Sequence, residues 1–177
     1  MIQRNFWRNV LPSVIAFAFS GVYSIVDGMF VGQGVGDAGL AAINVAWPVT
    51  ALVQALGTGL GMAAAVVLSV CIGRRDAAEE HRALGSTAVL LLLAGVLSTA
   101  LLALLYRPLL PLLGAEGSVL AYADSYTRVI VLGSLFQVLG TGLVPLLRTY
   151  DGADAAMCSM TAGFLTNVVL DALFISV

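Results

Sequence analysis

Two carboxylic acids, Asp27 and Asp171, lie within long apolar stretches of this 177-residue sequence. If these stretches cross a membrane, a carboxylate near the helix centre costs about 2.5–3.5 kcal/mol, so such a residue usually faces a cavity or a partner. The alternative for each acid is a place at a helix end, close to the lipid headgroups. That alternative is stronger for Asp27, which approaches the end of its apolar stretch, than for Asp171.

Each acid is preceded by polar or small residues at helical spacing. Residues three, four and seven apart share one face of a helix. The stripe before Asp27 contains Ser24, Tyr23, Ser20 and Ser13, and the stripe before Asp171 contains Asn167, Gly163 and Ser159. Each helix is therefore expected to carry one polar face, and the glycine permits close approach of a neighbouring helix.

The two acids are also expected at similar depth. Asp27 lies 19 residues beyond Arg8, and Asp171 lies 17 residues beyond Asp154. At 1.5 Å of rise per residue, the acids lie about 28 Å and about 26 Å from the starts of their helices. If the two helices run in the same direction, their carboxylates need only adjacent helices to meet.

Two carboxylates and the amide of Asn167 in a low dielectric offer two kinds of chemistry. Their oxygens can coordinate a monovalent cation such as Na⁺, or the carboxylates can share protons. Either event changes the charge of a buried site, which can bias a conformational equilibrium.

Residues typical of an enzyme are scarce. The single histidine, His81, lies in a charged loop from Arg74 to Arg82, where a solvated side chain is favoured over a metal ligand or a catalytic base. The two cysteines, Cys71 and Cys158, lie in apolar runs and predict neither a disulfide framework nor a metal centre. The sequence predicts no catalytic residue, no cofactor, and no metal beyond Na⁺ at the acidic site.

The composition identifies the elements that must position these side chains. Hydrophobic residues make up 60% of the sequence and charged residues 10%, and the mean hydropathy is +1.00. Soluble domains contain about 45–50% apolar and about 25% charged residues, so the chain is expected to be an integral membrane protein in contact with a lipid bilayer. A net charge of −2 and the absence of lysine exclude a nucleic-acid partner.

Five uncharged runs predict an all-α, polytopic membrane protein. A helix needs about 20 apolar residues to cross the hydrocarbon core, and each run reaches or nearly reaches this length once its flanks are added. The spans are expected near residues 10–31, 41–71, 84–105, 122–147 and 155–177. Pro48 lies inside the second run, which is long enough to be tilted or kinked. The glycine-rich segment Gly34–Gly39 is interpreted as a tight turn rather than a dinucleotide-binding loop, because no acid follows it at the required distance.

The arginines predict the orientation. With a cytoplasmic N-terminus, six arginines lie inside and two outside, as the positive-inside rule requires. The inner ones are Arg4, Arg8, Arg74, Arg75, Arg82 and Arg148, and the outer ones are Arg107 and Arg128. We therefore expect a multi-pass protein of the cell inner (plasma) membrane, with loops 32–40 and 106–121 outside and 73–83 and 148–154 inside. The less favoured alternative is an N-terminal signal peptide.

The remaining spans carry fewer polar groups. Helical spacing makes Gln54 and Thr58 of the second span candidates to line a cavity, with simple hydrogen bonding between helices equally favoured. Gln137 and Thr141 of the fourth span lie one turn apart and are two further candidates. Gly57 and Gly61 form a pair of small residues one turn apart, which is expected to let a neighbouring helix approach closely. The third span has almost no polar face and is expected to contact lipid.

Two acid-bearing segments resemble the N-terminal part of the multidrug and toxic compound extrusion (MATE) transporters. They are YSIVDGMFVG at residues 23–32 and NVVLDALFI at residues 167–175. Pro12, the loop at 73–76 and the turn at 148–152 also fit, so the resemblance extends over essentially the whole chain.

The resemblance implies a fold of twelve helices in two six-helix lobes, which exports cationic or amphipathic compounds by antiport against Na⁺ or H⁺. It assigns the coupling ion to Asp27, Asn167 and Asp171, with Tyr23 beside them. Pro12 corresponds to a proline associated with bending of the first helix; the alternative is that it lies in the first turn, where a proline bends nothing. Five helices would form most of one lobe, so the sixth helix and the C-terminal lobe are expected to be missing from this chain, and without them it should not transport.

Two other functions remain open at this point. One is a lipid-linked oligosaccharide flippase of related fold, which would be distinguished by an arginine-dense cavity that these spans do not show. The other is a different class, a membrane-embedded enzyme or a non-transporting membrane subunit. An enzyme would need a catalytic pair or a metal cluster beyond Val177.

Overall fold

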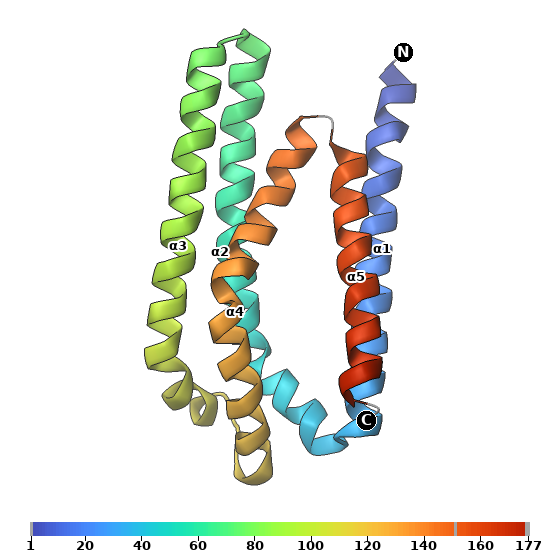
Figure 1. Cartoon of the computed structure of the whole chain (residues 1–177), viewed down its shortest axis with the longest axis vertical. Helices are drawn as coiled ribbons and strands as arrows, with labels where there is room; N and C mark the ends of the chain where they lie inside the picture. Colours follow the sequence, from blue (N-terminus) through green and yellow to red (C-terminus); the bar gives the residue numbers. More distant parts are fainter. Residues whose placement is uncertain (1, 151, 176–177) are drawn as a thin grey trace. The chain divides into compact units, whose positions relative to one another are not determined.

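A computed structural model describes residues 2–150 and 152–175, and it is all-helical over these residues (Figure 1). The elements are α1 (Ile2–Gly34), α2 (Asp37–Arg74), α3 (Ala77–Leu112), α4 (Gly117–Thr149) and α5 (Ala153–Ile175). No strand occurs among the described residues. The predicted all-α fold is confirmed.

The predicted spans lie within these helices, apart from the last two residues of the fifth, 176–177, which are outside the described part of the chain. Of the described segments, α2, α3 and α4 are long and apolar enough to cross a membrane, and α5 adds a shorter apolar stretch, Asp154–Leu170. The helices are longer than the apolar runs because their charged ends continue the same hydrogen-bonding pattern. At α3, for example, the Asp76 carboxylate caps the helix by accepting a hydrogen bond from the Glu79 amide at 3.1 Å.

The glycine-rich segment between the first two helices is a tight turn, as predicted. α1 ends at Gly34 and α2 begins at Asp37, so only two residues connect them. Gly36 has a φ of 82°, in the left-handed region that a residue without Cβ adopts at no steric cost.

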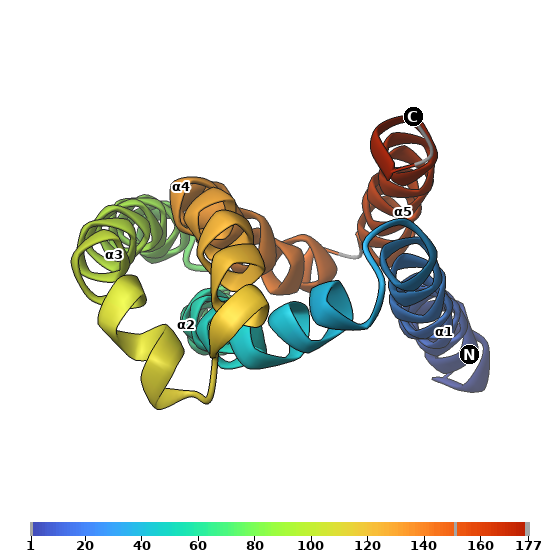
Figure 2. The same ribbon diagram turned by 90° about the horizontal axis from the view of Figure 1, so that it is seen from below.

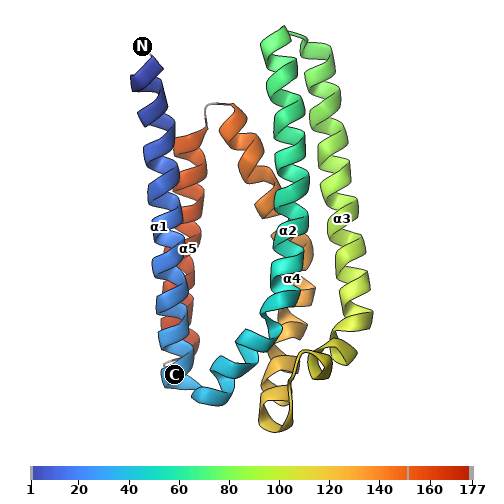
Figure 3. The ribbon, with the colours of Figure 1, turned by 180° about the vertical axis from the view of Figure 1, so that it is seen from behind.

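The chain divides into two compact units. The first comprises Met1–Leu40 and Tyr150–Val177, and within it α1 and α5 pack side by side and run in the same direction (Figures 1 and 3). The second comprises Ala41–Thr149, in which α2, α3 and α4 alternate in direction and pack around a common centre (Figure 2).

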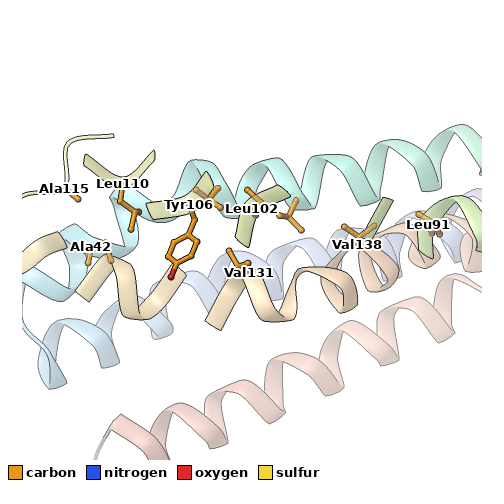
Figure 4. Packing of buried hydrophobic residues seen from close by; sticks show 11 residues of the cluster. Ala42, Leu91, Leu102, Tyr106, Leu110, Ala115, Val131 and Val138 are labelled. Atoms are coloured by element: carbon orange, nitrogen blue, oxygen red, sulfur yellow. The ribbon is translucent and has the colours of Figure 1, made fainter. Parts of the chain in front are cut away.

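The centre of the second unit is a core of aliphatic side chains with one tyrosine (Figure 4). Leu91 and Leu110 of α3 and Val138 of α4 are fully buried there. The opposite face of α3 exposes leucines such as Leu97 and Leu104, which is the arrangement expected of a helix that contacts lipid.

Helices α2 and α4 cross with their backbones in contact. A Cβ added at Gly61 would collide with the carbonyl oxygen of Gly142, and one added at Gly57 would collide with the Thr141 hydroxyl and lie 2.7 Å from the Val138 carbonyl oxygen. The expectation that the two glycines of α2 admit a close neighbour is therefore confirmed, and the neighbour is α4.

Polar contacts join α3 to α4 at two levels. The hydroxyls of Thr99 and Ser134 lie 2.7 Å apart in the middle of the helices. Towards the far end, Arg107 Nε lies 3.5 Å from Asp124 Oδ1 and donates a hydrogen bond to the hydroxyl of the buried Tyr106 at 3.2 Å. Pro48 lies inside α2, and the first turns of this helix diverge from its remainder, as its sequence predicts (Figures 1 and 3).

Candidate cation site on the first and fifth helices

The packing of α1 against α5 brings together the two helices that carry the predicted acids. Asp27 lies about two turns before the end of α1, and residue 171 lies about one turn before the end of α5. Because the two helices run in the same direction, these positions lie towards the same end of the pair (Figure 3). Asp27 is half-buried and takes part in an interaction within the protein.

Asn167 presents an oxygen suited to a cation or to a hydrogen-bond donor. The side chain is half-buried, and its Oδ1 atom is shielded from solvent without a hydrogen-bond partner among the described residues. A buried amide oxygen normally accepts at least one hydrogen bond, because leaving it unpaired costs the desolvation of that group. An additional group that offers positive charge or a proton donor would satisfy this atom.

The side chains of Tyr23, Asp171 and Pro12 lie outside the described residues. The backbone of α1 is nevertheless described, and Pro12 lies in the helix interior, well beyond the first turn that begins at Ile2. No group of three or more histidine, cysteine, aspartate or glutamate side chains that could hold a metal ion is found among the described residues.

The four predicted cavity residues all belong to the second unit. Gln54 of α2 is exposed, and Thr58 of α2 and Gln137 of α4 are half-buried. Thr141 lies at the crossing of α2 and α4, where its hydroxyl touches Gly57 and donates a hydrogen bond to the Gln137 carbonyl at 2.8 Å. An apolar groove of about 580 Å³ between α2 and α3 is lined by other residues, among them Leu56.

Three polar side chains that the sequence did not single out, Thr87, Thr127 and Ser134, are buried. Thr127 of α4 is 1% exposed, and its hydroxyl has no hydrogen-bond partner among the described residues. It lies on the buried face of α4, four residues from both Ala123 and Val131. Its spacing of four residues from apolar neighbours on both sides is the pattern in the sequence that predicts its burial.

Comparison with known proteins points to the same family as the two acid-bearing segments. A family model described as MatE matches residues 12–173. The multidrug export protein MepA of Staphylococcus saprophyticus is 25% identical over 166 residues, which cover 93% of this chain and 37% of the relative. The FAD transporter of Shewanella oneidensis is 30% identical, and the match covers 93% of this chain and 36% of that protein.

Solved structures give the same result. A MOP superfamily transporter from Pyrococcus furiosus is 30% identical with a TM-score of 0.90, and the match covers 97% of this chain and 38% of that one. A MATE structure in the bent conformation is 29% identical with a TM-score of 0.88, and the match covers 98% and 38% of the two chains. The chain thus spans under two fifths of the length of these relatives.

Proposed function

Because the chain belongs to the MatE family, we propose that it forms most of the N-terminal lobe of a twelve-helix secondary transporter. This transporter exports cationic or amphipathic compounds by antiport against Na⁺ or H⁺. The relatives that are multidrug export proteins support efflux as the activity and make an enzyme the weaker alternative.

The proposal rests above all on the pairing of α1 with α5. This pairing joins the helix of Asp27 to the helix of Asn167 and Asp171, with the shielded Asn167 oxygen on the same helix pair. Carboxylate and amide oxygens are ligands for Na⁺, and the carboxylates are acceptors for H⁺. Tyr23 precedes Asp27 by four residues, and the family resemblance places it beside the site.

The coupling then follows from the charge of this site. One bound Na⁺ or H⁺ compensates one of the two negative charges on α1 and α5, which weakens their repulsion and favours one arrangement of the helix pair. Loss of the ion restores the repulsion between Asp27 and Asp171 and shifts the equilibrium. A proline in the interior of α1 removes one backbone hydrogen bond, so Pro12 gives this helix a point at which to bend.

A second substrate class is favoured by one specific observation. The relative from Shewanella oneidensis is described as an FAD transporter and is 30% identical. An anionic dinucleotide is therefore the second candidate, and uptake of radiolabelled FAD into vesicles distinguishes it from an organic cation such as ethidium. The flippase alternative requires a cavity rich in arginine. The arginines of the second unit lie within two turns of a helix end or in the α2–α3 turn, except Arg128, which is exposed about three turns into α4.

The experiment compares Asp27→Asn and Asp171→Asn, alone and together, in the complete transporter that contains this chain. Ion-driven export of ethidium is measured in inside-out vesicles, with Na⁺ and pH gradients imposed separately. Each single substitution is expected to abolish export, and the double substitution is expected to be little worse, because residues that act as a unit are not additive. The matched control is Asp154→Asn, at an exposed acid in the first turn of α5, which should export normally.

Three outcomes contradict the proposal. Export that survives both single substitutions removes the acids from the coupling. Losses that multiply in the double variant show that the two acids act at separate sites. Loss of export in the Asp154→Asn control shows that any change of charge on α5 disturbs the protein.

A further inference from the structure

Two adjoining pockets occupy one face of α3 near its junction with α2. The first, of about 510 Å³, is partly polar and is lined by Asp76, Glu79, Arg82 and Ser86, with Val67 of α2 and two alanines. The second, of about 460 Å³, is lined by Gly85, Ser86, Val89, Leu90 and Leu93. Ser86 lines both, so the two pockets are neighbours along the helix, and we name them together the α3 groove.

The α3 groove changes from charged to apolar along the helix axis. Residues 79, 82, 86, 90 and 93 follow one another at spacings of three or four and therefore share a face. From Glu79 to Leu93 the helix rises about 21 Å, which is more than half of the hydrocarbon thickness of a bilayer. Val89, Leu90 and Leu93 are each at least half exposed. The apolar half thus lies open within a helix long and apolar enough to cross a membrane.

This polarity profile selects an amphipathic occupant. Its apolar part must run along α3 towards the membrane centre, and its polar part must reside at the α2–α3 turn, where headgroups lie. A phospholipid has both parts in this order. A protein partner or a second copy of the chain would instead have to displace lipid from the exposed aliphatic wall, and no feature of the groove favours that exchange.

The charges of the polar half select the headgroup. Two carboxylates and one guanidinium face this pocket. A purely anionic headgroup would meet two like charges, whereas an ammonium group donates up to three hydrogen bonds to carboxylates and a phosphate accepts from a guanidinium. The Asp76 carboxylate is already held in place by the Glu79 amide at 3.1 Å, which leaves its remaining lone pairs available.

We propose that the α3 groove binds a phospholipid with a primary-amine headgroup, of the phosphatidylethanolamine type. The ammonium group lies between Asp76 and Glu79, the phosphate contacts Arg82, and one acyl chain follows Ser86, Leu90 and Leu93. This lipid site belongs to the second unit and is independent of the cation site on α1 and α5.

The test measures which lipids remain on the purified chain by native mass spectrometry. The chain is reconstituted in nanodiscs of dioleoyl-phosphatidylethanolamine and dioleoyl-phosphatidylcholine in equal amounts, with a constant fraction of phosphatidylglycerol. Exposed ion pairs are worth at most about a five-fold preference, so the ethanolamine lipid is expected to be retained about three-fold over the choline lipid. Glu79→Gln should remove this preference, and Arg82→Gln should lower the retention of both lipids.

A steric variant tests the apolar half without changing any charge. A Cβ at Gly85 meets nothing within 4 Å, so Gly85→Phe can fill the groove without a clash in the helix. It should lower the retention of both lipids. The matched controls are Gly73→Phe, also at an open glycine near the same turn, and Glu80→Gln, next to the groove acid but outside the lining. Both controls should behave as the unmodified chain.

Each contrary outcome overturns the proposal. Equal retention of the ethanolamine and choline lipids shows that Asp76 and Glu79 do not discriminate between the two headgroups. Selective retention of phosphatidylglycerol that Arg82→Gln abolishes shows an anionic-lipid site instead. Retention that Gly85→Phe leaves intact places the bound lipid elsewhere on the protein.

Discussion

The contact between α2 and α4 gives a sharp prediction for Gly61→Ala. An added Cβ would collide with the carbonyl oxygen of Gly142 and lie 2.8 Å from its carbonyl carbon and its Cα. All three neighbours are backbone atoms, so no side-chain rotation can make room and the two helices must move apart. Such overpacking typically costs about 1–3 kcal/mol.

A matched substitution isolates this term. Alanine is favoured over glycine in a helix interior by about 1 kcal/mol, so Gly61→Ala is expected to lose a net of about 0–2 kcal/mol. Gly59 lies two residues earlier on the same helix, and a Cβ there meets nothing within 4 Å. Gly59→Ala therefore gains the same stabilisation from the higher helix propensity of alanine, without the collision. The free energy of unfolding should therefore be about 1–3 kcal/mol higher for Gly59→Ala than for Gly61→Ala, which is the cost of the overpacking.

The assay is reversible unfolding of the purified chain in mixed micelles, with increasing sodium dodecyl sulfate and helicity followed by circular dichroism. Both alanine variants and the unmodified chain are compared under one set of conditions. If Gly61→Ala is as stable as Gly59→Ala, the backbone contact between α2 and α4 does not exist in the folded protein. The reasoning from glycine spacing to helix approach would then fail with it.

Three further predictions concern orientation, bending and the polar contact in the second unit. In a chain whose native cysteines are replaced, a cysteine at Asp37 should react with a membrane-impermeant maleimide from outside, and one at Glu80 should not; the reverse pattern refutes the orientation. Pro12→Ala should abolish the Na⁺- or pH-dependent change of a spin-label distance across α1, and an unchanged response with full export would exclude the hinge. Thr99→Val should lower the free energy of unfolding by about 0.6 kcal/mol, because it removes the hydroxyl contact to α4. Ser98→Ala, at a hydroxyl bonded only within its own helix, is the control, and an equal loss there would contradict the assignment.

Much of the fold follows from the sequence because a bilayer imposes a simple rule. Charges are excluded from the hydrocarbon core, so the uncharged runs mark the helices and the arginines mark their ends. The close approach at Gly57 and Gly61 was also predictable, since two small residues one turn apart leave a groove on the helix. The helices extend beyond the runs because capping, as by Asp76, operates outside the hydrocarbon and depends on local hydrogen bonds.

The partners of individual side chains were not predictable in the same way. Helical spacing indicates which residues share a face, but it does not indicate which helix covers that face. Thr141 was a candidate to line a cavity, and only the position of α4 places it against Gly57. The ion pair between Arg107 of α3 and Asp124 of α4 joins two different helices, so helical spacing along one helix does not predict it. The polar half of the α3 groove likewise includes Val67 of α2, which helical spacing within α3 does not indicate.

The division of the chain places the proposed ion site in one compact unit and the α3 helix in the other. Asp27 and Asn167 belong to the first unit, which contains α1 and α5, and the hydrophobic core cluster of α2, α3, α4 and their connections belongs to the second. A change of charge at the site acts first on the helices that carry it, so its effect on local opening is expected in α1 and α5. Amide hydrogen exchange should show Na⁺ or acidic pH protecting α1 and α5 while exchange in α3 stays constant. A response of equal size in α3 would mean that the ion reorganises the packed core instead, and the proposed division of roles would be wrong.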